Sequence, residues 1–312
     1  MTLGPFQRYA GDLAPGDRGV LDACWSSFTV DAVRSSADPV FDEVYDRLAR
    51  EFAGRGEMER REVIEDRFSW DPRKPVDGHA LLYEMLVVRH EGEIVAVRDH
   101  TAISPPAALA TGAGGGVVVH LSHVLVEPSM RGRGLASWLR ALPIETARRC
   151  AWLAREGDAA ASPVSHPGSP AATMTSARIT LVAEMEHDDG SSAAIIRRLR
   201  SYARAGFSLV DPSRVTYHQP DFRRADEIDR SGVQSVPLSL VVRRVGDELE
   251  GHICGAELRE LVSALHAMFA VHVRRDHMDE VRALLASMPA AAEQVALLVP
   301  GPALATASEA LR

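Results

Sequence analysis

Apolar residues recur at every fourth position in the segment that follows residue 38. Such spacing places them along one side of a helix, and Asp38 stands where a side-chain cap of the first turn would be. A second helix is predicted from Met58 to Phe68, and Pro72 and Pro75 then mark a loop. The four apolar positions of the first helix are Val40, Val44, Leu48 and Phe52.

The period changes after the prolines, from a helical repeat to β-rich runs. Leu82–Arg89 and Glu93–Ile103 flank His90-Glu91-Gly92, which predicts a hairpin. Gly112–Gly116 form a glycine-rich connection into another strand, Val117–Val126. These runs predict a sheet with antiparallel neighbours in the first half of the chain.

Helical and extended patterns then alternate. An amphipathic helix is predicted from Leu135 to Leu153, with a break at Pro143 because proline cannot donate a backbone hydrogen bond. Residues 156–177 are small, polar and proline-containing, and we expect a long mobile insertion there. The remaining predicted elements are a strand at Ile179–Met185, a helix at Ala193–Arg204, a closing strand pair at Val215–Tyr217 and Val236–Arg244, and helical structure from Ala256 to Met288.

Strands mixed with helices, some antiparallel and some joined by crossovers, predict an α/β or α+β fold with a mixed sheet. The chain of 312 residues, with 46% hydrophobic and 25% charged residues, has the composition of a globular protein. No apolar run approaches the roughly 20 residues that cross a bilayer, and the N-terminus lacks a signal-peptide pattern. We therefore expect a cytoplasmic protein without membrane contact.

Charge and cysteine content narrow the class of protein further. The formal net charge of −8 disfavours a nucleic-acid binder, which would usually be basic. Cys24, Cys150 and Cys254 are scattered and odd in number, so neither a disulfide framework nor a structural zinc site is expected.

The segment from Val126 to Ala136 (VEPSMRGRGLA) carries the most chemical information. A predicted strand runs through a tight glycine loop directly into a helix. Such a loop leaves backbone N–H groups pointing outward at the positive end of a helix, where they can bind phosphate oxygens. A tight turn with no ligand would also use these glycines, but the chain has no Gly-Lys-Ser/Thr of a P-loop and no GxGxxG of a dinucleotide fold.

Two ordered motifs resemble one known family. Arg131-x-x-Gly134-x-Ala136 is similar to the (Gln/Arg)-x-x-Gly-x-(Gly/Ala) signature of the GNAT acyltransferases, and Tyr202-Ala-Arg-Ala-Gly206-Phe207 resembles the Tyr-x-x-x-Gly-Phe of the same family. The resemblance covers about residues 80–246. It implies a GNAT core at 78–246, an N-terminal helical region at 1–77 on the acceptor side, and a C-terminal helical extension with a tail at 247–312.

The resemblance also implies a site for acyl-CoA, most simply acetyl-CoA. The loop amides would hold the pyrophosphate, the backbones of Val124 and Val126 would pair with the pantetheine arm, and an N–H near Val124–Leu125 would polarise the acyl carbonyl. The implied binding residues are Val124, Leu125, Val126, Arg131, Gly132, Arg133, Gly134, Leu135, Ala136 and Ser137.

For catalysis the resemblance implies a general acid at Tyr202, although a packing role against CoA is an equal alternative. His120 stands where some protein-acetylating members have a catalytic glutamate, and His123, Glu184 and Glu186 are rival bases. A regular strand would place His120 and His123 on opposite faces, whereas a bulge of the kind found in GNAT domains would change this phase. We expect no metal, because imidazoles three residues apart on a strand do not converge.

The implied activity is transfer of an acyl group from CoA to a primary amine, on a small molecule or a peptide. A GNAT-fold transferase that uses aminoacyl-tRNA or acyl-carrier protein, and a non-catalytic acyl-CoA-binding module, are the alternatives. The intact loop favours CoA, and Tyr202 favours an enzyme. An apolar stripe on the helix around Leu258–Phe269 would cover the sheet or, alternatively, form a homodimer contact.

Overall fold

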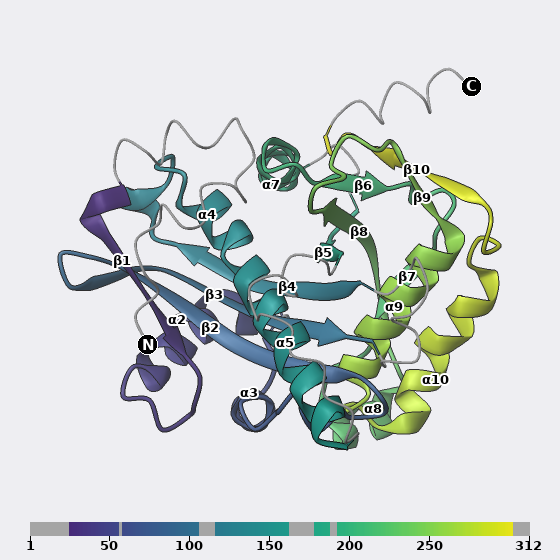
Figure 1. Cartoon of the computed structure of the whole chain (residues 1–312), viewed down its shortest axis with the longest axis horizontal. Coiled ribbons are helices and arrows are strands. Elements are labelled where there is room, and N and C mark those ends of the chain that lie inside the picture. Colours follow the sequence, from purple (N-terminus) through teal and green to yellow (C-terminus); the bar gives the residue numbers. More distant parts are fainter. Residues whose placement is uncertain (1–24, 56–57, 106–115, 162–177, 188–191, 302–312) are drawn as a thin grey trace. The chain divides into compact units, whose positions relative to one another are not determined.

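The computed structural model describes residues 25–55, 58–105, 116–161, 178–187 and 192–301 (Figure 1). The chain divides into two compact units, residues 1–179 and 180–312, so that the boundary falls at the first residue of strand β5 (Ile179–Met185). Both units combine strands with helices, which confirms the predicted α/β class. The expected division at residues 77 and 246 stays a prediction.

The sheet of the first unit has the order β1-β2-β3-β4, with every neighbouring pair antiparallel. The β2–β3 turn is a tight hairpin in which Glu91 and Gly92 both have positive φ angles, 53° and 89°, as a type I′ turn requires. The hairpin and the predicted strand at 117–126 are therefore confirmed. Strand β1 lies where the sequence pattern predicted no element. The bounds are β1 (Phe28–Val33), β2 (Ala80–His90), β3 (Glu93–Ser104) and β4 (Val117–Val126).

Helices cover both faces of this sheet (Figure 1). On one face, the Phe41 ring of α2 packs on Phe68, which in turn packs on Tyr83 of β2. The other face is covered by α4 and α5, which meet at the predicted break before Pro143. The bounds are α2 (Phe41–Phe52), α3 (Arg61–Arg67), α4 (Leu135–Ala141) and α5 (Pro143–Ala161).

Two predictions about these helices need correction. The N-cap of α2 is Val40 and has no side-chain cap, because the Asp38 carboxylate accepts a hydrogen bond from the Val40 amide, one residue ahead of the helix. Helix α5 continues to Ala161, so the first residues of the segment expected to be a mobile insertion are helical. Residues 162–177 of that segment lie outside the described residues.

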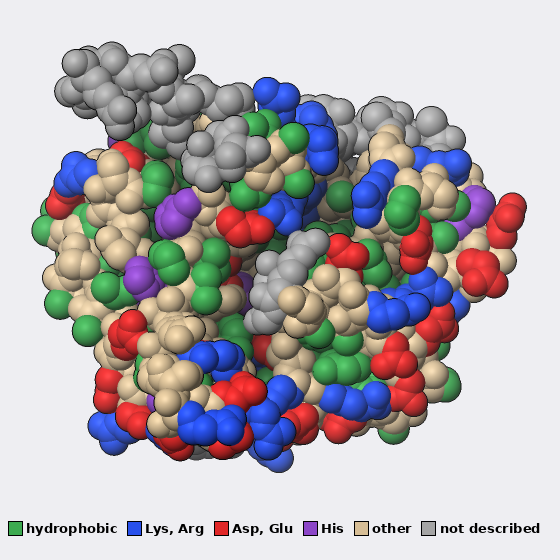
Figure 2. All heavy atoms as spheres, turned by 180° about the vertical axis from the view of Figure 1, so that it is seen from behind, with side chains coloured by type: hydrophobic (Ala, Val, Ile, Leu, Met, Phe, Trp, Pro, Cys, Tyr) green, Lys and Arg blue, Asp and Glu red, His purple; other side chains and the backbone are tan. Residues whose placement is uncertain are grey.

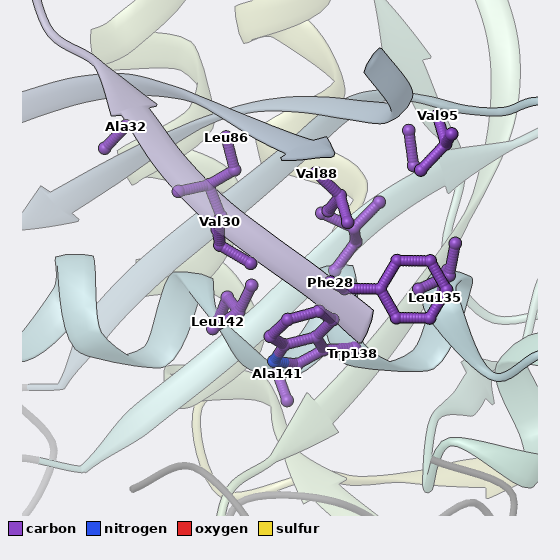
Figure 3. Close-up of a cluster of buried hydrophobic side chains, with 12 residues drawn as sticks. Phe28, Val30, Ala32, Leu86, Val88, Val95, Leu135, Trp138, Ala141 and Leu142 are labelled. Atoms are coloured by element: carbon purple, nitrogen blue, oxygen red, sulfur yellow. The ribbon is translucent and has the colours of Figure 1, made fainter. Parts of the chain in front are cut away.

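A cluster of buried apolar side chains joins α4 to the sheet (Figure 3). Phe28 and Val30 of β1 and Val88 of β2 share this face with Leu135 and Trp138 of α4. Burial of these side chains removes apolar surface from water and so fixes the start of α4 against the sheet.

The strands of the second unit follow the order β5-β8-β6-β10-β9, and β7 pairs with the first residues of β8. Antiparallel pairing of β7 with β8 confirms the predicted closing pair. Its strands are β6 (Ser208–Val210), β7 (Tyr217–Gln219), β8 (Val236–Arg244), β9 (His252–Cys254) and β10 (Gln294–Leu298).

The helices of the second unit are α7 (Ala193–Arg204), α8 (Ala225–Ser231), α9 (Gly255–Phe269) and α10 (Arg275–Ala283). The prediction of helices at 193–204 and within 256–288 is confirmed. The part after residue 246 is helical in α9 and α10 as predicted, and it also contains two short strands that the sequence did not predict: β9 and β10 pair with each other, and β10 pairs with β6.

Charged side chains of both signs are interspersed on the face that Figure 2 shows. On α2 and α3, Arg47 pairs with Glu43 and Arg61 with Glu65. None of the helices in the described ranges has both the length and the apolarity that a membrane span requires.

Candidate functional site

The loop after β4 has the backbone conformation that the sequence motif predicts. A short 3-10 turn (η4, Pro128–Met130) leads through extended Arg131 into two glycines with positive φ, Gly132 at 82° and Gly134 at 78°. Gly134 is the N-cap of α4, and no side chain caps the helix there. A residue with a Cβ would be strained at this φ angle, so a glycine at position 134 lets the chain turn into α4 without strain.

The amides of this loop are available for a ligand. In the described part of the chain, the N–H groups of Gly132, Gly134, Leu135 and Ala136 donate to no backbone carbonyl. The amide of Ser137, in contrast, donates to the Gly134 carbonyl at 3.0 Å and closes the first turn of the helix. Four backbone donors at a helix start form an arrangement that can bind an anion.

Side chains around the loop add positive charge and anchor it. Arg131 and Arg133 are exposed, and the Arg131 Nε donates to the Val126 carbonyl at 3.1 Å. Leu135, in contrast, is buried in the cluster of Figure 3. The loop therefore presents its amides and arginines outward from a packed base.

The last residues of β4 direct some of their backbone groups toward the edge away from β3. The Glu127 amide donates to the Val95 carbonyl at 2.9 Å, so it points toward β3. Because backbone direction alternates along a strand, Leu125 also points toward β3, whereas Val124 and Val126 point to the other edge. Val124 and Val126 are the two positions where an extended ligand could pair with β4.

A bulge interrupts β4 four residues before Glu127. Arg98 of β3 opposes Val124, and His100 opposes Leu121, so Ser122 and His123 together face Asp99. The extra residue changes the alternation, and His120 and His123 come to the same face of the sheet. The bulge that the GNAT resemblance implied is thus present, and the opposite-face arrangement of a regular strand does not occur.

Below the bulge lies a buried polar cluster, which we define as Glu59, Arg67, Tyr83, Asp99 and His123. His123 Nδ1 lies 3.0 Å from Asp99 Oδ1, and the same carboxylate oxygen accepts the His123 backbone amide at 2.7 Å. The Tyr83 hydroxyl donates to Asp99 Oδ2 at 3.2 Å. Arg67 pairs with Glu59 at 2.7 Å, and Glu59 Oε2 lies 3.8 Å from His123 Nε2.

The charges of this cluster control its ionisation. Burial by itself would raise the pKa of Asp99, but His123 and Arg67 outweigh burial and hold that pKa well below its usual range. Glu59 behaves alike: burial opposes ionisation, whereas Arg67 and His123 bring the pKa below its ordinary value. Burial and the neighbouring Asp99 raise the pKa of Tyr83 well above 10.0, so this hydroxyl stays protonated.

The sequence interpretation missed Glu59, Arg67 and Asp99. A signal for Asp99 does exist, because Arg98-Asp99-His100-Thr101 are four consecutive polar residues inside an otherwise apolar strand. All four are buried, and β3 is covered on both faces. Glu59 and Arg67 carry no comparable signal, since nothing in a polar helical segment tells which charges will be buried.

A second polar group occupies the opposite face of the sheet, beneath α5. The Thr146 hydroxyl donates to Glu84 Oε2 at 2.7 Å and lies 2.7 Å from His100 Nε2, while Arg149 pairs with Glu84. Burial lowers the pKa of His100 to about 4, so the imidazole is neutral. These groups pair with one another in the interior and have the character of core polar residues, although His100 Nδ1 has no hydrogen-bond partner among the described residues.

Tyr202 and Glu184 belong to the second unit. Tyr202 is buried at the end of α7, where Phe207 donates its amide to the Tyr202 carbonyl at 3.1 Å and Gly206 donates to Ala203 at 3.0 Å. With Gly206 at φ 79°, this is a Schellman motif, and the rings of Tyr202 and Phe207 contact at 5.0 Å as the motif predicts. The Tyr-x-x-x-Gly-Phe spacing therefore has a structural reason independent of catalysis.

Glu184 on β5 is engaged at both carboxylate oxygens. It accepts hydrogen bonds from the Tyr217 hydroxyl at 2.5 Å and from Gln219 Nε2 at 2.8 Å. Glu186 pairs with Arg198 at 2.6 Å and is half-buried. Among the described residues, no group of three His, Cys, Asp or Glu side chains has the arrangement of a metal site.

Comparison with known proteins gives similarity in structure only. No protein-family model and no curated protein matches the chain. Among solved structures, a protein described as a GNAT-family acetyltransferase from Bacteroides thetaiotaomicron is similar with a TM-score of 0.43 and 13% identity, covering 78% of this chain and 99% of that chain.

Two further similar structures contain a CoA ligand. The acetyltransferase yncA from Salmonella typhimurium, solved with acetyl-CoA, has a TM-score of 0.34 and 16% identity over 72% of this chain and 97% of its own. AAC(6')-Ib, in complex with ribostamycin and coenzyme A, has a TM-score of 0.35 and 16% identity over 70% and 93%. With TM-scores below 0.5, these similarities do not by themselves assign a function to the chain.

Proposed function

We propose that this chain is a GNAT-type N-acyltransferase, which moves an acyl group, most simply acetyl, from CoA to a primary amine by direct attack. The observation that carries the proposal is the loop from Arg131 to Ala136, in which uncapped amides and two left-handed glycines open onto α4 beside exposed arginines. Backbone donors of this kind suit a diphosphate.

The chain's own groups supply the binding contacts. The amides of Gly132–Ala136 would hold the pyrophosphate. Val124 and Val126, whose backbone groups point away from β3, would pair with the pantetheine arm. The Val124 amide is the donor on that edge for the acyl oxygen, because the Leu125 amide points toward β3.

Acyl-CoA would supply the activated acyl group. The amine must lose a proton before it attacks, and the departing sulfur must gain one. Tyr202 is the proposed acid, as its place in the sequence motif indicates. The candidate bases are His120, which lies buried beside Ser122 at 3.1 Å, and its rivals His123 and Glu184.

For the acceptor of the acyl group, only a chemical class is proposed. Ribostamycin is bound in AAC(6')-Ib, and another similar structure, an acetyltransferase from Salmonella typhimurium, modifies the N-terminal serine of a ribosomal protein. We propose an amine on a small molecule or a peptide as the acceptor of this chain.

The test is turnover of acetyl-CoA with spermidine, ribostamycin, lysine and a peptide with N-terminal serine, followed by release of the CoA thiol. Amine-dependent thiol release supports the proposal. Tight acetyl-CoA binding without thiol release for any amine would favour the non-catalytic binding module, and absence of acetyl-CoA binding would contradict the assignment of the loop.

A further inference from the structure

We propose that His123, oriented by Asp99 and facing Glu59, takes up the proton that the acceptor amine loses. This inference rests on the proposed function and assigns its base. Asp99 and Glu59 are positioning residues in it, because they act through the imidazole.

The contact between His123 and Asp99 determines which ring nitrogen of the imidazole carries a hydrogen. Asp99 Oδ1 lies 3.0 Å from His123 Nδ1, and an ionised carboxylate can only accept. The hydrogen of the neutral imidazole is therefore on Nδ1, and the basic lone pair is on Nε2. Because Asp99 Oδ1 also accepts the His123 amide at 2.7 Å, the ring and its own backbone are held by one carboxylate.

Glu59 lies opposite the Nε2 atom of His123. Glu59 Oε2 is 3.8 Å away, too far for a direct hydrogen bond, and it has no hydrogen-bond partner among the described residues. The unprotonated His123 Nε2 and Glu59 Oε2 are both hydrogen-bond acceptors, and they face each other across this gap. A proton on Nε2, or an O–H or N–H donor beside both atoms, resolves the conflict.

The buried polar cluster has an excess of negative charge while His123 is neutral. Glu59 and Asp99 are ionised, and Arg67 contributes one positive charge against these two. Tyr83 stays neutral. Proton uptake by His123 brings the cluster to neutrality, so the imidazolium is stabilised on both sides by carboxylates.

Two further elements of the described chain place groups near His123 and Glu59. Helix α2 contributes Phe52, whose ring lies 4.9 Å from the imidazole, and Tyr45, whose hydroxyl donates to the Glu59 carbonyl at 3.3 Å. Strand β4 contributes His120, which is near enough to Glu59 to favour its ionised form.

His120 is less well prepared for the same task. Its Nδ1 lies 3.1 Å from the Ser122 hydroxyl, which can donate or accept, so this contact does not select a tautomer. His123 differs because a buried carboxylate fixes its hydrogen.

In the proposed step the acceptor ammonium loses a proton to His123 and then attacks the acyl carbon. An ammonium R–NH3⁺ gives one proton to His123 Nε2, through water where the gap requires it, and keeps the electron pair as R–NH2. That pair forms the bond to the acyl carbon, the C–S bond breaks with its electrons on sulfur, and the sulfur takes a proton. The imidazolium later returns its proton to solvent.

The kinetic test compares His123→Gln with His120→Gln in the full chain, using acetyl-CoA and the best amine of the panel between pH 5 and 9. We expect His123→Gln to lower kcat/KM by about 10²- to 10⁴-fold and to remove its decline on the acidic side. We expect His120→Gln to keep that decline. Loss of the decline in His120→Gln with its retention in His123→Gln would overturn the inference.

Asp99→Asn tests the positioning role. Removal of the negative charge beside the imidazolium should move the acidic decline to lower pH and reduce kcat, with little change in KM. A purely structural role would lower the amount of active enzyme without moving the pH profile, and that result would count against the inference.

A spectroscopic readout covers the case in which His123→Gln does not fold. In the unaltered protein, ¹⁵N spectra of the imidazoles should show His123 protonated at Nδ1 throughout and titrating at Nε2. A hydrogen on Nε2 with a bare Nδ1 would overturn the assignment.

Acetyl-CoA affinity separates this inference from the proposed function. If the wild type binds acetyl-CoA and turns over amine, but the acidic decline persists without His123, only the inference fails. If the wild type does not bind acetyl-CoA, the proposed function itself fails.

Discussion

At the scale of single residues, the buried polar cluster has two carboxylates and one guanidinium in the interior of the first unit. Glu59 and Arg67 have only 6% and 2% of their side chains exposed. Taking such charges from water is costly, and the pair contributes to stability only while both partners are present. The cluster therefore makes the stability of this unit sensitive to single substitutions.

We predict that Glu59→Gln destabilises the fold by about 3–5 kcal/mol, because it leaves Arg67 buried with a weakened counter-charge. Urea unfolding measures the loss. The matched control is Glu62→Gln, which removes an exposed glutamate from its pair with Arg60 and should change the free energy of unfolding by no more than about 0.5 kcal/mol. Equal effects of the two substitutions would contradict the burial of this ion pair.

Two buried histidines, His100 and His266, should make the free energy of unfolding depend on pH. Burial lowers the pKa of His100 and of His266 to about 4 from the ordinary 6.5. An unfolded chain binds these protons more readily, so their contribution to stability is complete above pH 6.5 and declines as the pH falls toward 4. Each group contributes up to about 3 kcal/mol by this route.

The measurement is the free energy of unfolding between pH 7 and 4, with His266→Gln as the variant. His266 lies in the second unit, where it stacks on Tyr217 with ring centroids 6.3 Å apart. The variant should show a shallower decline of stability with falling pH than the wild type. An unchanged slope would show that His266 does not stay neutral in the interior.

At the scale of elements, hydrophobic period predicted most of the helices and longer strands. The hairpin, β4, the break at Pro143 and α7 all follow from local signals such as alternation, a turn dipeptide or proline. Strand β1, in contrast, follows Gly- and Pro-punctuated sequence, and the three-residue strands β6 and β9 are too short to show a period.

One part of the candidate site was predictable from the sequence, and another part was not. The glycine loop was predictable because its function rests on backbone conformation, which glycine spacing reports. The buried polar cluster was not, because Glu59 and Asp99 are brought together by packing of α3 and its flank on the sheet. The bulge at Ser122–His123 has no local signal either, yet it determines that both histidines share one face.

The end of α7 allows a clean test of Tyr202. The Schellman motif and the ring contact with Phe207 do not require the hydroxyl, so both can persist in Tyr202→Phe. We predict that it lowers kcat about 10- to 100-fold or more, in the range of a lost general acid, while the Kd for acetyl-CoA stays within twofold. An unaltered kcat would remove Tyr202 from the acid role.

At the scale of the whole molecule, the chain combines two compact units, each of which contains strands and helices. The loop, the bulge and the buried polar cluster all belong to the first unit, and Tyr202 and Glu184 belong to the second. The first unit can therefore be tested for ligand binding by substitutions that leave the second untouched.

The most direct test of the account is calorimetric titration of acetyl-CoA into the wild type, Gly134→Glu and Gly92→Glu. Gly134 and Gly92 both have positive φ, 78° and 89°, so each substitution strains the backbone by about 1–2 kcal/mol. Only the first places a carboxylate among the amides of the loop.

We predict that Gly134→Glu weakens acetyl-CoA binding by about 100-fold or more, since juxtaposed like charges cost several kcal/mol, and that Gly92→Glu binds as the wild type does. Equal affinity of all three proteins for acetyl-CoA would contradict the assignment of this loop to the diphosphate.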